Sequence, residues 1–140
     1  MKKLPRQVTI PVLMVMILDG LFTLVGQPAG YWNNPSLVRE GSPLGFSLLL
    51  HNPFFFILFF IIYLTVVYWG LKKLPIVISL PGAIALFLGH VWGSSSWLSV
   101  LYRKFGFEIF DFYNWWLSIS YFVVIAIITS LFILRVDKLK

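Results

Sequence analysis

Four long apolar stretches alternate with shorter polar segments along the chain. They cover residues 8–26, 46–69, 74–101 and 113–134, and each is long enough for a helix to cross about 30 Å of hydrocarbon. Apolar residues run through them continuously, without the alternation of polar and apolar positions that is typical of membrane β-barrel strands. The pattern predicts an all-α protein, an integral membrane four-helix bundle that forms one domain over residues 1–140.

The composition supports a membrane location. Of the 140 residues, 59% are hydrophobic and 11% are charged, which leaves too few charges to cover the surface of a water-soluble domain of this size. Cysteine is absent, so disulfides, thiolate metal sites and cysteine nucleophiles are excluded. We expect the protein to be integral to a cell membrane, the inner (cytoplasmic) membrane of a prokaryote, with lipid around the bundle.

The basic residues predict the orientation of the bundle. Eight of the eleven Lys and Arg residues precede the first stretch, separate the second from the third, or follow the fourth, and only Arg39, Arg103 and Lys104 fall on the opposite side. Because basic residues concentrate in cytoplasmic segments, we expect both termini in the cytoplasm and the connections 27–45 and 102–112 outside. Positive charge at segment ends indicates topology control, and no nucleic-acid module is apparent.

Several polar residues fall at similar depths in the outer half of this predicted bundle. The candidate cluster contains Asp19, Thr23, Glu40, His51, His90 and Ser94. A charged group at membrane depth costs about 2.5–3.5 kcal/mol on insertion scales, so it rarely faces lipid. We therefore expect Asp19 to pair with a group on another helix or on the outer connection. Thr23, one turn along the same helix, is a local alternative partner.

The cluster has structural and functional interpretations. Hydrogen bonds between helices, worth about 0.6–2 kcal/mol, would explain Asp19 and His90 without any site, and His51 is close enough to the membrane surface to be solvated. Asp19, His51 and His90, with Glu40 as a further ligand, are residue types that bind metal ions, although no ligand spacing along a helix supports a metal site. Haem ligation by His51 and His90 is another alternative.

No catalytic constellation is complete. His90 and Ser94 share one helical face at i, i+4, as a base and a serine nucleophile could. The segment 93–96, Gly-Ser-Ser-Ser, lacks the Gly-x-Ser-Gly motif of rhomboid-type intramembrane proteases, so we expect no enzymatic activity.

Two function hypotheses follow from the sequence. In the first, the protein is a small accessory or structural subunit of a larger membrane assembly, in contact with a membrane protein partner or with further copies of itself. In the alternative, the outward-facing polar cluster binds a metal ion, a proton, a lipid headgroup or a haem.

A short motif lies in the first third of the chain. Asp19, Thr23, Glu40 and Pro43 match the pattern Asp-x-x-x-Thr … Glu-x-Asn-Pro, with Ser42 in place of the asparagine. In these positions the chain resembles a family of small four-helix bacterial and archaeal membrane proteins of unknown function. The resemblance implies a shared outward-facing polar site and no particular activity.

Overall fold

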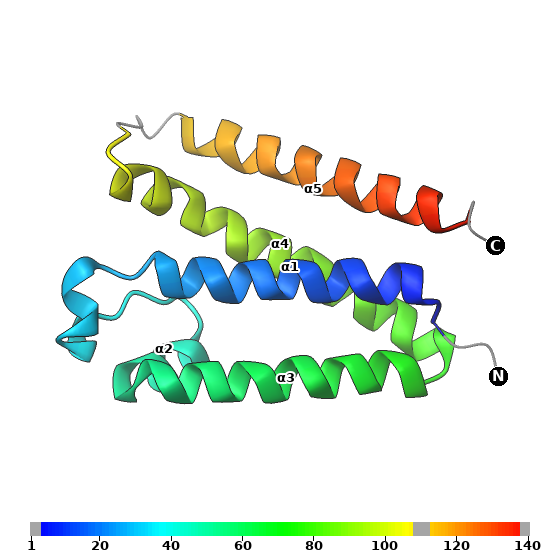
Figure 1. Cartoon of the computed structure of the whole chain (residues 1–140), viewed down its shortest axis with the longest axis horizontal. Coiled ribbons are helices and arrows are strands. Elements are labelled where there is room, and N and C mark those ends of the chain that lie inside the picture. Colours follow the sequence, from blue (N-terminus) through cyan, green and yellow to red (C-terminus); the bar gives the residue numbers. More distant parts are fainter. Residues whose placement is uncertain (1–3, 108–112, 138–140) are drawn as a thin grey trace.

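The computed structural model describes residues 4–107 and 113–137, and all regular structure in these ranges is helical (Figure 1). The helices are α1 (Arg6–Val25), α2 (Pro43–His51), α3 (Pro53–Lys73), α4 (Ile76–Lys104) and α5 (Tyr113–Asp137), with short 3-10 helices η1 (Ala29–Trp32) and η2 (Pro35–Leu37) between α1 and α2. Four of them, α1, α3, α4 and α5, are long and apolar enough to cross a membrane. The predictions of an all-α protein and of four helices long enough to cross a membrane are confirmed. Of the predicted outer connection 102–112, residues 108–112 lie outside the described ranges.

Helix α1 is the centre of the bundle. It packs most extensively against α4 and also contacts α3 and α5. In Figure 1 it runs between α5 and α3, and α4 crosses behind it. Of the 18-residue apolar window of α1, 39% is buried inside the protein, against 6% of the window in α5. The start of α1 and the end of α5 lie at the same end of the bundle, as four antiparallel spans require (Figure 1).

Apolar side chains pack between helices toward the end of the bundle where α1 begins. Leu4, Val12, Met16, Leu71 and Ala83 form one buried cluster there, which joins α1 to the hairpin of α3 and α4. The hairpin turn is short, since α3 ends at Lys73 and α4 begins three residues later, after Pro75. Helix α3 does not continue through Pro75, because proline has no backbone N–H to donate to the preceding turn. We name this half of the bundle the inner half and the opposite one the outer half, after the orientation that the basic residues predict.

The second apolar stretch is not one helix, and the prediction of a continuous span over 46–69 is wrong. The chain breaks at Asn52, whose backbone is extended with φ −171° and ψ 136°. Pro53 is the cause, because a proline disfavours helical backbone in the residue before it. The Asn52 side chain then accepts a hydrogen bond of 2.8 Å from the Phe54 backbone N–H and caps α3. His51 is left exposed in the last turn of α2.

The connection between α1 and α2 is folded against the opposite, outer end of the bundle. Gln27 is fully buried: its Nε2 donates to the carbonyl oxygens of Thr23 (2.9 Å) and Arg39 (2.7 Å), and its Oε1 accepts from the Arg39 N–H (2.9 Å). Tyr31 is also fully buried, and its hydroxyl donates to the carbonyl oxygen of Leu49 in α2 at 2.9 Å. Burial raises the pKa of the Tyr31 phenol above its usual 10.0. Two side chains thus fix the connection to α1 and α2.

Candidate functional site

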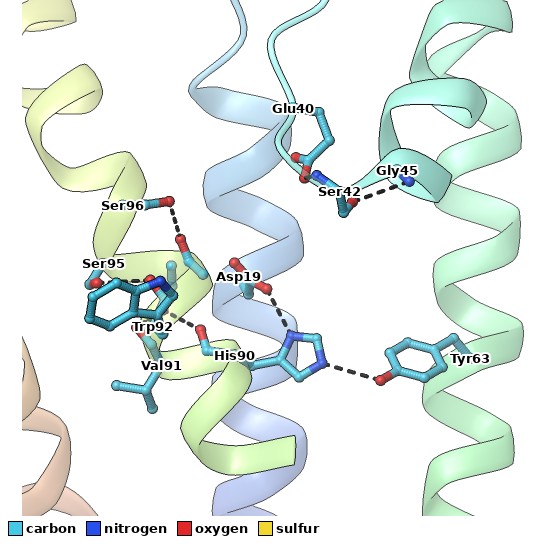
Figure 2. Close-up of polar contacts among 12 residues, drawn as sticks. Asp19, Glu40, Ser42, Gly45, Tyr63, His90, Val91, Trp92, Ser95 and Ser96 are labelled. Atoms are coloured by element: carbon cyan, nitrogen blue, oxygen red, sulfur yellow. Dashed lines mark hydrogen bonds and ion pairs between the residues drawn. The ribbon is translucent and has the colours of Figure 1, made fainter. Parts of the chain in front are cut away.

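Asp19 and His90 join α1 to α4 in the outer half of the bundle. Asp19 Oδ2 lies 2.7 Å from His90 Nδ1, and each side chain keeps an exposed fraction of 19% (Figure 2). Gly93, one turn further along α4, makes room for the carboxylate, because a Cβ atom there would lie 2.8 Å from both carboxylate oxygens. Asp19 is therefore paired with a group on another helix, one of the partners that the sequence suggested.

The contact continues from His90 to a third helix. His90 Nε2 lies 3.3 Å from the hydroxyl oxygen of Tyr63 on α3 (Figure 2). When Asp19 is ionised it can only accept, so Nδ1 carries the imidazole proton and Nε2 accepts from the Tyr63 hydroxyl. Tyr63 was not predicted, because its surroundings in the sequence, FFIIYLTVV, have no periodicity that indicates which side of the helix is buried.

Ser94 belongs to a separate contact. Its side chain is fully buried, and its Oγ lies 2.7 Å from the carbonyl oxygen of His90 and 2.9 Å from the hydroxyl oxygen of Tyr121 on α5. The bond to His90 goes to the backbone and not to the imidazole, so this pair does not form a nucleophile and its base. Ser94 therefore links α4 to α5 through its hydrogen bond with Tyr121.

Two cavities meet at the Asp19–His90 pair. The larger, about 860 Å³, extends along α4 to Trp92 and Trp97, and the smaller, about 340 Å³, extends toward Phe59 and Phe60 on α3. Both are lined by the same five polar residues, Asp19, Thr23, Glu40, Ser42 and His90. We call these two spaces together the outer cavity.

The motif residues Glu40 and Ser42 form the upper wall of the outer cavity. Figure 2 shows them above Asp19, on the segment that leads into α2. Glu40 Oε1 accepts from the Ser42 N–H at 2.9 Å, and Ser42 Oγ accepts from the Gly45 N–H at 3.2 Å. The second bond caps the first turn of α2, and the first holds the Glu40 carboxylate over the cavity.

The outer cavity is acidic. Its lining contains the carboxylates of Asp19 and Glu40 and the imidazole of His90, and none of the described residues that line it is Lys or Arg. Its net charge is therefore −2 when His90 is neutral and −1 when it is protonated. Among the described residues no hydrogen-bond partner of Asp19 Oδ1 is found, so this oxygen is available to a ligand. The other walls are largely apolar and aromatic.

The structure places the remaining predicted residues as follows. Thr23 is buried on α1 and lines both parts of the outer cavity. His51 is exposed and lines neither part. Within residues 4–107 and 113–137, no group of three or more His, Asp or Glu side chains could hold a metal ion. The structure thus does not assemble Asp19, His51 and His90 as metal ligands, nor does it bring His51 to His90 across this cavity for a haem.

Comparisons of the chain with protein-family models, with curated proteins and with solved structures find no match. The resemblance of Asp19, Thr23, Glu40 and Pro43 to a family motif stays a prediction. The chemistry of the outer cavity has to be inferred from its own residues.

Proposed function

We propose that the protein binds a small amphiphile with a positively charged nitrogen in the outer half of the membrane. The observation that carries the proposal is a cavity of about 860 Å³ between apolar walls that holds two carboxylates and, among the described residues, no Lys or Arg. Ligand sites in proteins usually have volumes of about 300–1,000 Å³ and combine apolar walls with a few placed polar groups. The outer cavity has both properties.

The Asp19–His90–Tyr63 chain supports this proposal because it fixes the carboxylate before a ligand arrives. His90 holds Oδ2 at 2.7 Å, which leaves Oδ1 to accept a hydrogen bond from an ammonium group. Charge-assisted hydrogen bonds of this kind are stronger than neutral ones. Trp92 and Trp97 line the same space, and the face of an indole ring attracts a cation within about 6 Å.

The accessory-subunit hypothesis rests on a different observation. Large apolar side chains are exposed along α3 and α5, among them Phe54, Ile61, Val66, Val123 and Leu131. Lipid can cover these faces as well as a partner helix can, because membrane association has no hydrophobic driving force between helices. Contact with a membrane protein partner or with a second copy therefore stays a prediction, and we favour ligand binding.

The proposal is tested by calorimetric titration of the protein in nanodiscs. Hexylammonium is the probe, and hexanol and hexanoate carry the same apolar tail with no charge or a negative charge. We expect saturable binding of hexylammonium and binding of the other two that is at least about tenfold weaker, since a hydrogen bond to a charged group contributes about 1.5–3 kcal/mol. Asp19→Asn should remove this preference. Equal binding of all three probes would show that the cavity is only an apolar gap.

A matched control for this titration is Thr65→Val. Thr65 lies on α3 at an exposed position, and its hydroxyl bonds to the carbonyl oxygen of Ile61 in its own helix. It lines neither part of the outer cavity. We expect this variant to bind hexylammonium as the unmodified protein does.

We also infer that the termini are cytoplasmic and that the outer cavity opens away from the cytoplasm. The eight-to-three distribution of basic residues supports this orientation. Reporter fusions at both termini should have cytoplasmic activity, and a reporter inserted near Asn34 should be external. A terminus found outside would reverse the orientation of the cavity.

A further inference from the structure

A third cavity, of about 490 Å³, lies beyond the outer cavity at the outer end of the bundle. It is formed where the end of α1 meets the end of α4 and the segment that leads to Glu40. Arg39, Arg103 and Lys104 all line it, and these are all three of the basic residues that the topology places outside. Because the sequence separates Arg39 from the other two by more than 60 positions, the fold and not the local sequence brings the charges together.

Two of the three bases are held in place by hydrogen bonds at the end of α1. Gln27 bonds to both the N–H and the carbonyl oxygen of Arg39 at 2.9 and 2.7 Å, which fixes the backbone that carries the guanidinium group. Lys104 Nζ donates to the carbonyl oxygens of Val25 (2.6 Å) and Gln27 (2.9 Å). The positions of both residues are therefore set by the same buried turn.

Lys104 has a structural role that the arginines do not share. Its ammonium group satisfies carbonyl oxygens at the C-terminal end of α1, where the helix dipole favours a positive charge. Within the described ranges, Arg103 donates only from Nε, to the carbonyl oxygen of Ser99 at 3.3 Å. No hydrogen bond or ion pair of the Arg39 guanidinium is found within the part of the chain that the structure describes.

The neighbouring carboxylate does not neutralise this cavity. Glu40 follows Arg39 directly, but its Oε1 accepts from the Ser42 N–H and its side chain lines the outer cavity instead. The only ion pair among the described residues joins Asp19 to His90. Three positive charges around one space repel each other, and a bound anion relieves that repulsion.

The level of the cavity in the membrane indicates which anion it would meet. Helix α1 has 20 residues, and at about 1.5 Å per residue it spans about 30 Å, the thickness of the hydrocarbon core. Its end at Val25 therefore lies at the hydrocarbon boundary, and the cavity beyond it lies among the lipid headgroups. Paired guanidinium groups match the oxygens of a phosphate.

We propose that Arg39, Arg103 and Lys104 form a phosphate-binding site at the outer membrane surface. The phosphate is that of a phospholipid headgroup or a free phosphate ion, and the two sources share the chemistry of the site. The arginines contact the phosphate oxygens, and Lys104 contributes its charge from a fixed position. The site does not depend on the ligand of the outer cavity, since it shares no lining residue with that cavity.

Native mass spectrometry and calorimetry test this site on the full-length protein in a neutral detergent. The probes are dihexanoyl phosphatidylglycerol, dihexanoyl glycerol, which lacks the phosphate, and inorganic phosphate. We expect the phospholipid to bind at least about tenfold more tightly than the glycerol, and we expect the double variant Arg39→Gln, Arg103→Gln to lose about tenfold or more in phosphate affinity. Arg39→Lys keeps the charge without the planar fork and should have an intermediate effect.

Lys73→Gln is the control, because it removes one positive charge at the opposite end of α3 while the outer bases stay in place. It should bind the phospholipid within about twofold of the unmodified protein, since surface charges this distant are screened. Binding of inorganic phosphate that depends on the two arginines would identify a free anion as sufficient, and binding of phospholipid alone would identify the headgroup; both support the site. Equal affinity for phospholipid and glycerol, or no effect of the double variant, would overturn it. Circular dichroism of the double variant checks that it is folded.

Discussion

The two halves of this bundle are held together in different ways. In the inner half, apolar side chains such as Val12, Met16 and Ala83 fill the space between α1, α3 and α4. In the outer half, polar side chains link the same helices and two cavities lie between them. Lipid is as apolar as a leucine side chain, so apolar contact alone does not specify which helices meet. Polar bonds in the outer half can specify the arrangement of the helices and still leave room for a ligand.

Replacing Gln27 is expected to destabilise the outer half more than any other substitution considered below. Gln27→Leu removes three hydrogen bonds and leaves the backbone N–H and carbonyl oxygen of Arg39 without partners. These two backbone groups are partly buried, and a buried group left unpaired costs about 1–3 kcal/mol. We expect a total loss of about 3 kcal/mol in the free energy of unfolding and loss of amide protection over residues 28–42. Hydrogen exchange measures the second effect. Asn34→Ala is the control, because the bonds of Asn34 to Ser36 are exposed.

Gly93 and Gly89 offer a matched pair of substitutions on α4. A Cβ atom at Gly93 would lie 2.8 Å from the carboxylate oxygens of Asp19, whereas nothing lies within 4 Å of a Cβ atom at Gly89. We expect Gly93→Ala to lower the free energy of unfolding by about 1–3 kcal/mol, as overpacking does. Gly89→Ala should be neutral or slightly stabilising, because alanine favours a helix. Equal thermal stabilities of the two variants would contradict the close approach of α1 and α4.

Substitutions of Asp19 distinguish the contribution of its side chain to stability from its role in ligand binding. Asp19→Asn keeps a hydrogen-bonding group beside His90, so we expect it to cost about 1 kcal/mol in the free energy of unfolding, and Asp19→Leu to cost about 2 kcal/mol. Both variants should lose the preference for hexylammonium, because neither offers the charged Oδ1 acceptor of Asp19, and the remaining carboxylate, Glu40, is engaged by the Ser42 N–H. If Asp19→Asn retained that preference in the titration, the carboxylate would have a structural role only. Thermal unfolding in detergent provides the stability measurement.

We expect Tyr31 to make the outer half sensitive to alkaline pH. Its pKa is higher in the folded protein than the usual 10.0 because the phenol is buried. Above about pH 10 the unfolded chain releases this proton before the folded protein does, so stability is fully present below that pH and falls as the pH rises toward the folded pKa. Protease sensitivity of the segment between α1 and α2 should therefore rise in this range. Tyr31→Phe should abolish the pH dependence specific to this segment.

Two serines on α4 give the smallest expected effects. Ser79 Oγ is buried in the inner half with no hydrogen-bond partner among the described residues, so Ser79→Ala should change the free energy of unfolding by less than about 0.5 kcal/mol or stabilise the protein. Ser94→Ala removes the bond to Tyr121 and should cost about 1 kcal/mol. Thermal unfolding compares them. A larger loss of stability for Ser79→Ala than for Ser94→Ala would contradict the difference between a polar-bonded outer half and an apolar inner half.

The sequence predicted the four spans and the level of the polar cluster but not how the helices face each other. Continuous apolar runs define length and depth, which was enough to place Asp19 and His90 near each other. Such runs do not indicate which side of α3 turns inward, and so Tyr63 was missed. The break between α2 and α3 at Asn52 and Pro53 had a local signal in the sequence, the proline. The prediction of one continuous helix gave more weight to the length of the apolar stretch. The cavity of Arg39, Arg103 and Lys104 depends on two bonds of the Gln27 side chain to the Arg39 backbone, 12 positions away. It also depends on bonds of Lys104 to the carbonyl oxygens of Val25 and Gln27, 79 and 77 positions away. No local sequence pattern indicates these contacts.

The bond between Asp19 and His90 also constrains how the chain is made. The two residues are 71 positions apart, and a ribosome that adds about 5–20 residues per second needs roughly 4–14 s to synthesise the intervening chain. During that time the nascent first helix carries a carboxyl group whose imidazole partner does not yet exist. We therefore expect this helix to enter the membrane on the strength of its apolar residues, with Asp19 lacking its imidazole partner until the third span has been synthesised.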